Sequence, residues 1–226
     1  MLTSMFRNRD VAGEQLGRRL QERLFHDALV LAIPNGGVVV GSALAEVLNA
    51  ELDVLLIRRL AAPGNPEVTI GAVSEGGAIY LNHHCSAVQA GLPEDFVRRE
   101  IREQLEMLGT RRRLIRSLRR PARITGRSVI VTDDGIVTGT TMHAALTVVR
   151  AQSPHELIVA VPVVPRNRIE DVRHNCDELV YLLAPELPEP LGDFYADFPK
   201  IEDAQVAELM RASFAHSPCS AIQAHG

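Results

Sequence analysis

The chain has 226 residues, of which 46% are hydrophobic, and a formal net charge of −4 at pH 7. This length can bury one sizeable α/β core with extensions, without support from a metal or from disulfides. The negative net charge gives nucleic acid no general attraction, so we expect no nucleic-acid partner. No apolar run approaches the roughly 20 residues of a membrane span, so we also expect no membrane partner.

The cysteines indicate the compartment. The chain has three cysteines, Cys85, Cys176 and Cys219. Their spacing is not that of zinc ligands, and it does not suggest a set of disulfide pairs. A disulfide scaffold and a structural zinc site are therefore not expected. The N-terminus lacks the apolar core of a signal peptide. Together these features predict a cytoplasmic protein.

The first part of the chain alternates between helix and strand patterns. Apolar residues are spaced for a helix from Val11 to Leu24, and an apolar strand is expected at 28–33. The turn 34–37 then breaks the chain before a second helix pattern from Val40 to Leu48, and another strand is expected at 53–57. This order predicts parallel strands joined by helices, with ligands at the carboxyl ends of the strands.

From about residue 60 to residue 125 the chain leaves this rhythm. A loop is expected at 62–66, and two segments, 67–73 and 78–81, have the patterns of paired strands. A long amphipathic helix is expected at 94–118. An insertion of this length predicts a flap or a dimer arm, and we expect a homodimer.

Arginines are crowded between Arg98 and Arg127, among several glutamates. Such a run is typical of a solvated helix face with ion pairs along it. Subunit contacts or a surface for RNA remain the alternatives.

The alternation resumes after the insertion. Strands are expected at 128–132, 156–164 and 178–183, with a helix from about 140 to 151. The sequence therefore predicts an α/β fold, with a parallel sheet flanked by helices.

The segment 128–141 is the most informative part of the sequence. An apolar strand leads into Asp133 and Asp134, where that strand would end. Small and hydroxyl-bearing residues follow, directly before a helix: Gly135, Thr138, Gly139, Thr140 and Thr141. Free N–H groups at a helix start favour an anion, and ionised carboxylates accept hydrogen bonds from vicinal hydroxyls. The pattern predicts a phosphosugar site, and the alternative is an acidic turn that caps a core helix.

This segment resembles the phosphoribosyl-pyrophosphate (PRPP) motif of type I phosphoribosyltransferases, in which two acids precede a loop that ends in Thr-Gly-x-Thr. The resemblance implies that Asp133 and Asp134 hold the ribose 2- and 3-hydroxyls, and that Mg²⁺ is bound near them through those hydroxyls or water. It also implies that a loop holds the 5-phosphate, made of Gly135, Ile136, Val137, Thr138, Gly139, Thr140 and Thr141. The implied fold is a single domain over residues 1–215, with a C-terminal hood at about 185–212 and a loose tail at 216–226.

The turn Pro34-Asn35-Gly36-Gly37 occupies the place of the family's pyrophosphate loop, after the first core strand. Relatives of this kind have Pro-Arg-Gly-Gly, so Asn35 replaces a charge with a neutral amide. Backbone N–H groups could still bind pyrophosphate, and Arg58 or Arg59, just past a strand end, could reach it. The alternatives are a purely structural turn, and arginines that pair with surface acids.

The C-terminal part is rich in aromatic residues, with Phe194, Tyr195 and Phe198 close together. These rings could stack on a nucleobase in the hood, or they could simply cover the sheet edge. Together with Arg58-Arg59-Leu60, they resemble a little-characterised bacterial branch of the superfamily, and this likeness covers most of the chain.

The resemblance implies an enzyme that binds Mg-PRPP and transfers the 5-phosphoribosyl group to a nitrogenous base with release of pyrophosphate. Asp133, Asp134, Arg58 and Arg59 would be its catalytic residues. The alternative is a non-catalytic protein that senses PRPP or a nucleotide and binds RNA or another protein. Asn35 and Val137 favour this alternative, because 6-oxopurine enzymes usually have an aspartate where Val137 stands.

Overall fold

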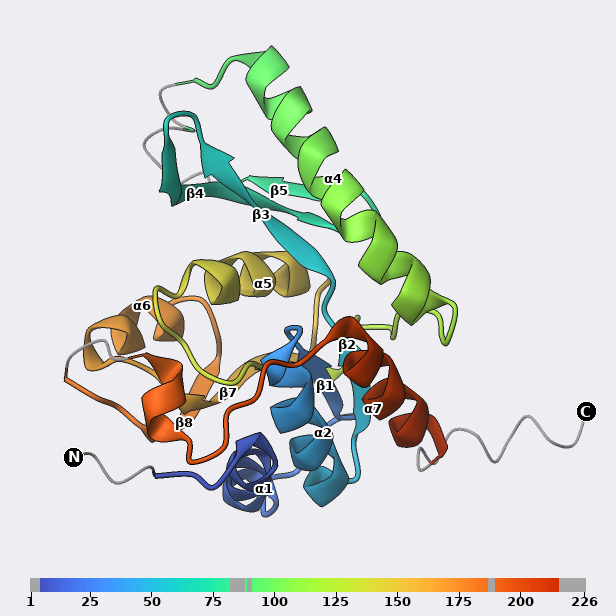
Figure 1. The fold of residues 1–226 in the computed structure, drawn as a ribbon, viewed down its shortest axis with the longest axis vertical. Coiled ribbons are helices and arrows are strands. Elements are labelled where there is room, and N and C mark those ends of the chain that lie inside the picture. The colour runs from blue at the N-terminus through green and yellow to red at the C-terminus, as the bar shows by residue number, and fades with distance from the viewer. Residues whose placement is uncertain (1–4, 82–87, 89–90, 187–189, 216–226) are drawn as a thin grey trace, which may run out of the picture.

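Five apolar segments form one parallel sheet, with the strand order β2-β1-β6-β7-β8 (Figure 1). The computed structural model describes residues 5–81, 88, 91–186 and 190–215. The strands of the sheet are β1 (Leu29–Ala32), β2 (Glu51–Val54), β6 (Ser128–Thr132), β7 (Glu156–Val163) and β8 (Glu178–Leu183). Every pairing in this sheet is parallel, which confirms the predicted α/β fold.

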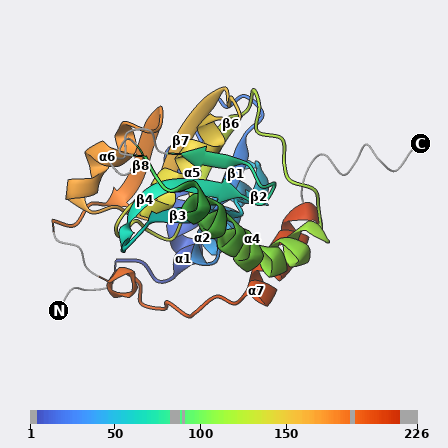
Figure 2. The same ribbon diagram turned by 90° about the horizontal axis from the view of Figure 1, so that it is seen from above.

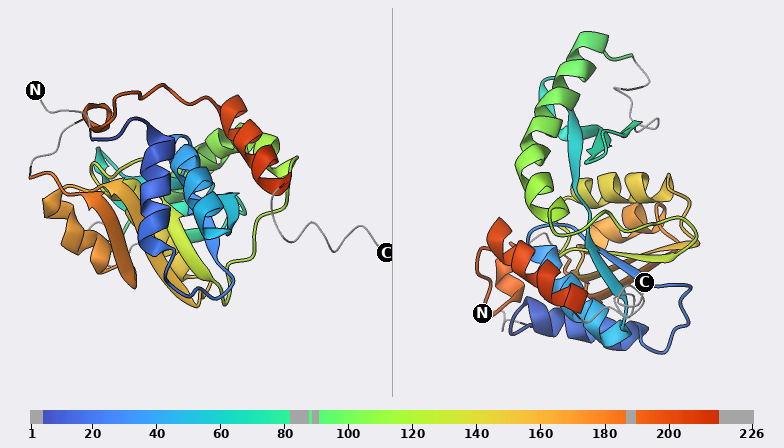
Figure 3. Two further views of the ribbon diagram at one scale, coloured as in Figure 1. Left: turned by 90° about the horizontal axis from the view of Figure 1, so that it is seen from below. Right: turned by 90° about the vertical axis from the view of Figure 1, so that its right-hand side faces the viewer.

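Helices cover both faces of this sheet (Figures 1 and 3). One face is covered by α1 (Arg9–Leu20), α2 (Gly36–Leu48) and α7 (Asp203–Ala215), and the other by α5 (Thr140–Arg150) and α6 (Ile169–Arg173). Neighbouring residues of a strand point to opposite faces, so Val129 packs towards α5 and Ile130 towards α2. Both are fully buried, which explains why successive residues in the middle of β6 are apolar without alternation.

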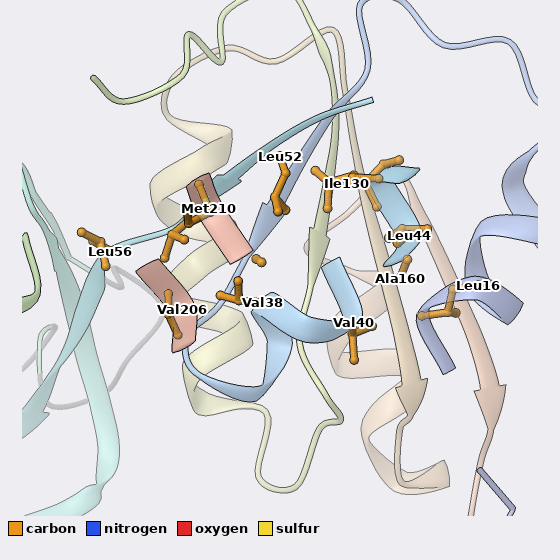
Figure 4. Packing of buried hydrophobic residues seen from close by; sticks show 14 of the residues in the cluster. Leu16, Val38, Val40, Leu44, Leu52, Leu56, Ile130, Ala160, Val206 and Met210 are labelled. Carbon is orange, nitrogen blue, oxygen red and sulfur yellow. The ribbon is translucent and has the colours of Figure 1, made fainter. Parts of the chain in front are cut away.

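The core beneath α1, α2 and α7 joins distant parts of the chain (Figure 4). Leu52 and Ile130 of the sheet pack in one buried cluster with Val38 of α2 and with Val206 and Met210 of α7. The last described helix therefore belongs to the core and holds the C-terminal part of the chain against the N-terminus of α2.

Residues 57–81 and 91–116 form an arm that projects from the domain (Figures 1 and 2). It consists of an antiparallel sheet and a long helix: β3 (Ile57–Ala62), β4 (Asn65–Ser74), β5 (Ile79–Leu81) and α4 (Glu94–Arg116). The predicted pairing of two strands around residues 74–77 is confirmed. The predicted loop at 62–66 is too long, because β3 and β4 leave only Pro63 and Gly64 between them, and Gly64 has a φ of +72°.

The first helix ends at Leu20 and not at Leu24, whose side chain is 95% exposed in the turn that follows. The predicted hood region contains the short 3-10 helix Leu191–Phe194, an extended segment and α7. The predicted tail 216–226 lies outside the described residues. No helix of the described chain is both long enough and apolar enough to cross a membrane.

Candidate active site

The acid pair lies at the carboxyl edge of the sheet, directly after β6. The side chain of Asp133 accepts a hydrogen bond from the backbone N–H of Asp134 at 2.8 Å, and both residues are partly buried. Burial, followed by the charge of Asp134, raises the pKa of Asp133 well above its ordinary value. Two adjacent carboxylates with little solvent favour a ligand that donates hydrogen bonds to them.

Arg9, at the start of α1, is joined to this pair and was missed by the sequence analysis. Its Nε lies 2.8 Å from Oδ2 of Asp134, and the two side chains are only 7% and 14% exposed. Its Nη1 donates to the carbonyl of Pro199 at 2.8 Å, and its guanidinium lies 3.6 Å from the centroid of the Phe198 ring. Arg9 therefore fixes Asp134 and at the same time holds a C-terminal segment beside the site.

The turn 34–37 lies directly against the acid pair, as predicted for parallel strands that end at one edge. A Cβ on Gly36 would be 1.9 Å from Oδ2 of Asp134, and a Cβ on Gly37 would be 2.7 Å from Cα of Asp133. Only glycine allows this approach. The turn contains a cis peptide bond between Pro34 and Asn35, and it leads into α2, which has no side-chain cap. The first N–H groups of α2 are therefore available to an anion.

The side chain of Asn35 points to the segment that we call the strap, residues 194–203. Its Nδ2 donates to the carbonyl of Ile201 at 2.8 Å and to Oδ1 of Asp203 at 2.9 Å. Arg111 of α4 binds the same oxygen of Asp203. Burial acts to raise the pKa of Asp203, but the hydrogen bonds from Arg111 and Asn35 outweigh it and lower that pKa. Asn35 thus ties the turn to the strap.

The predicted phosphate loop follows the acid pair. Its Ile136 is 4% exposed, and the N–H of Ile136 donates to the carbonyl of Val163 at 2.8 Å, so β7 anchors the loop. Gly139 has a φ of +81° and stands at the start of α5, which has no side-chain cap. Thr138 and Thr140 join their hydroxyls at 3.1 Å. The loop therefore presents hydroxyls and the N–H groups of a helix start, which suit a phosphate.

A hollow of about 380 Å³ opens beside this loop. Thr69 of the arm lines it together with Thr138 and Gly139 of the loop, Thr140 and His143 at the start of α5, and Arg168 directly before α6. The arm therefore reaches the same cavity as the phosphate loop.

Arg58 and Arg59 are placed differently from our expectation. Arg58 is exposed and donates to Gln104 at 3.0 Å and to the sulfur of Met107 at 3.3 Å, so its contacts are with α4 and not with the turn. Arg59 is the next residue of β3 and is partly buried. The strand end near residue 57 begins the arm, which leads these arginines away from the sheet edge.

The aromatic residues pack against each other and against the N-terminal segment. Phe194 and Tyr195 are 6% and 4% exposed, and the Tyr195 ring lies 5.4 Å from that of Phe6 and 4.9 Å from that of Phe198. The hydroxyl of Tyr195 donates to the backbone carbonyl of Asp134 at 2.6 Å. Burial raises the pKa of Tyr195, so the hydroxyl remains a donor. The rings of Phe194 and Tyr195 are thus covered by protein, which favours the covering role over base stacking.

The carboxylates fit Mg²⁺ only in part. Within the described ranges, no group of three or more His, Cys, Asp or Glu side chains could hold a metal ion. Asp133 and Asp134 offer the hard oxygens that Mg²⁺ prefers, but Arg9 occupies one of them. Since Mg²⁺ is commonly bound by one or two carboxylates together with substrate phosphates and water, the pair fits an ion that arrives with its ligand.

Comparison with known proteins agrees with this geometry. The family described as "Phosphoribosyl transferase domain" matches residues 10–189. The chain is 36% identical over 223 residues to "Putative phosphoribosyl transferase MT0597" and to "Putative phosphoribosyl transferase Rv0571c", both from Mycobacterium tuberculosis. The match covers 97% of this chain and 50% of each relative, so the chain spans half the length of these curated relatives.

A solved structure is also similar. The crystal structure of TT1426 from Thermus thermophilus superposes with a TM-score of 0.86 at 37% identity, and the match covers 92% of this chain and 98% of that one. The resemblance noted in the acid pair and its loop is confirmed: the chain belongs to the phosphoribosyl transferase domain family.

Proposed function

We propose that this chain is a phosphoribosyltransferase that binds PRPP with Mg²⁺ and transfers the 5-phosphoribosyl group to a nitrogenous base. The observation that supports it best is the contact between the turn 34–37 and the acid pair, in which Gly36 leaves no space for a Cβ beside Asp134. This contact joins a group of N–H donors for phosphates to a pair of acceptors for sugar hydroxyls. A plain helix cap requires neither the second carboxylate nor this close approach.

The reaction needs electrostatic support and no covalent nucleophile. The bond between C1 of the ribose and the pyrophosphate oxygen breaks, and its electron pair leaves on pyrophosphate. The acceptor nitrogen supplies the electron pair of the new bond and releases its proton to solvent. Positive charge develops on the ribose and negative charge on pyrophosphate, so fixed donors and acceptors around both lower the barrier.

Each part of the site has one task in this proposal. Asp133 and Asp134 accept hydrogen bonds from the ribose hydroxyls, and Arg9 keeps Asp134 in place through its 2.8 Å contact. The N–H groups of Gly36 and Gly37, at the start of α2, receive the pyrophosphate, and the loop 135–141 receives the 5-phosphate. Bound Mg²⁺ would supply positive charge to the phosphate oxygens.

The arm has a role in this proposal as well. PRPP is also open to attack by water, so an enzyme of this class must exclude solvent from the ribose. Thr69 of β4 lines the cavity beside the phosphate loop, so the arm reaches the side of the site that would hold the 5-phosphate.

The test measures PRPP binding by isothermal titration calorimetry with Mg²⁺ present. Asp134→Asn removes a charged acceptor and is expected to weaken binding by roughly 1.5–3 kcal/mol, which is about 10-fold to 100-fold. Asp177→Asn is the matched control, because Asp177 accepts from the N–H of Leu157 near the opposite end of β7. Equal affinities of wild type and Asp134→Asn would contradict our placement of the ribose.

A second function remains open: a non-catalytic protein that senses PRPP or a nucleotide. The observation that favours it is Asn35, whose neutral side chain points to the strap and supplies no charge at the turn. An assay of pyrophosphate release with PRPP and a panel of bases separates the two functions. Release supports the enzyme, whereas tight binding without release supports the sensor. The homodimer and the cytoplasmic location also remain proposals, and light scattering tests the first.

A further inference from the structure

The pyrophosphate turn lacks a cation of its own, which raises the question of which side chain supplies positive charge there. Arg58 is engaged with Gln104 and Met107 on α4. Arg9 lies beside Gly36, but it is 7% exposed and its charge is matched by Asp134 at 2.8 Å. Arg9 could therefore reach a new anion only by leaving the buried carboxylate of Asp134 without its counter-charge. The contacts of Arg58 are with α4 and not with the turn.

Arg111 is placed differently. Its Nε and Nη2 lie 3.0 Å and 2.8 Å from Oδ1 of Asp203, the same oxygen that accepts from Asn35 at 2.9 Å. The guanidinium of Arg111 and the side chain of the turn residue Asn35 therefore lie close together, because both donate to Oδ1 of Asp203. The side chains of Arg111 and Asp203 are 31% and 39% exposed, so this ion pair can open at a modest cost.

We propose that Arg111 supplies the positive charge for the pyrophosphate at the turn 34–37; this inference rests on the proposed function. When the ligand binds, Arg111 exchanges Asp203 for a pyrophosphate oxygen, where its planar fork can make two hydrogen bonds. Asp203 keeps the hydrogen bond from Asn35 and is not left without a donor. This arrangement also explains why an amide suits position 35. Asn35 keeps Asp203 in place, while Arg111 of α4 supplies the positive charge.

The experiment compares three ligands on purified full-length variants by isothermal titration calorimetry. The ligands are Mg-PRPP, Mg-pyrophosphate and ribose 5-phosphate, which lacks the pyrophosphate group. Arg111→Gln is expected to weaken Mg-PRPP and Mg-pyrophosphate by roughly 10-fold or more, because a charge-assisted contact is lost. The affinity for ribose 5-phosphate is expected to be unchanged, which also shows that the variant is folded.

Two further variants separate a contact with the ligand from a structural role. Asp203→Asn breaks the same ion pair but leaves Arg111 free, so it is expected to bind Mg-pyrophosphate as tightly as wild type or more tightly. Arg112→Gln removes the neighbouring exposed charge of α4 and is expected to bind like wild type.

The possible results are distinct. Equal weakening in Arg111→Gln and Asp203→Asn would show that the ion pair is only structural and would overturn the inference. Unchanged pyrophosphate affinity in Arg111→Gln would also overturn it, while binding of PRPP by wild type would leave the proposed function intact. If wild type binds none of the three ligands, the proposed function itself fails.

Discussion

The two ends of α4 contain the same residue types but are held in different ways. Near its N-terminus, Arg98 pairs with Glu94 on the helix surface, and both side chains are more than 70% exposed. Near its C-terminus, Arg116 is 12% exposed and binds Asp53, which is 2% exposed, at 2.8 Å. Arg116 also binds Glu75 at 2.6 Å. Only the C-terminal end is therefore fixed to the domain by buried charges.

The apolar contacts follow the same division. Leu108 and Ile115, in the second half of α4, belong to the main core and are 3% and 0% exposed. Ile101, in the first half, packs only partly buried against the strands of the arm. The helix α4 thus joins the main core to the strands of the arm. The charge pattern of the sequence alone does not show which half of α4 is anchored to the main core.

The largest expected effect is that of Arg116→Met. Removing one partner of a buried pair leaves Asp53 without its counter-charge and is expected to destabilise the fold by about 3–5 kcal/mol. Urea unfolding, followed by circular dichroism, measures the change. A loss below about 1 kcal/mol would mean that this network does not anchor the arm.

A second prediction concerns pH and Glu51, which binds Arg127 at 2.5 Å and also Arg119. Burial acts to raise the pKa of Glu51, but hydrogen bonds and charges from Arg127 and Arg119 outweigh it and hold that pKa below its ordinary value. Because the pKa of Glu51 is lower in the folded state than in the unfolded state, its charge stabilises the fold at pH values above the unfolded-state pKa. This stability is lost as the pH falls through the folded-state pKa.

The test compares the urea midpoints of wild type and Glu51→Gln at several pH values. Glu51→Gln is expected to be less stable than wild type at neutral pH, and the difference is expected to shrink below about pH 4.5. A difference that stays constant down to about pH 3 would show that the charge of Glu51 contributes nothing.

A smaller effect is expected in the apolar contacts of the helix. Ile115→Val removes one methyl group from the core and is expected to cost about 0.5–1.5 kcal/mol. Ile101→Val is the matched change in the other half and is expected to cost less, since that site is only partly buried. Equal losses in chemical unfolding would remove the distinction between the two halves.

The smallest effect is expected for Arg98→Ala. An exposed pair four residues apart on a helix contributes only about 0.3–0.5 kcal/mol, and salt screens it. The unfolding midpoint should therefore move very little, and less at high salt. A shift as large as that of Arg116→Met would contradict the contrast between the two ends.

Much of the fold follows from local pattern. The strand 128–132 is buried throughout and apolar from Val129 to Val131 because helices cover both of its faces, and Asp133 and Asp134 mark where that cover ends. The contact between the acid pair and Gly36 also follows, because parallel strands end at one edge.

Other parts of the site leave no local signal. Arg9 is one of many arginines, and its partner Asp134 is 125 positions away. The arginine run was expected to be a solvated face, which holds for Arg98 but is wrong for Arg116. Arg116 binds the buried Asp53, and a partner 63 positions earlier in the chain leaves no local pattern in the sequence. The choice between base stacking and packing for Tyr195 likewise depends on Phe6, at the other end of the described chain.

The link from Arg9 to Asp134 and Pro199 has a consequence for biosynthesis. The ribosome makes residue 134 well before residue 199, so a nascent chain can already contain the acid pair and the glycine turn. It cannot yet contain the carbonyl and the Phe198 ring that hold Arg9. The pocket is therefore completed only once residue 199 has been made, after the strands of the main sheet have already been synthesised.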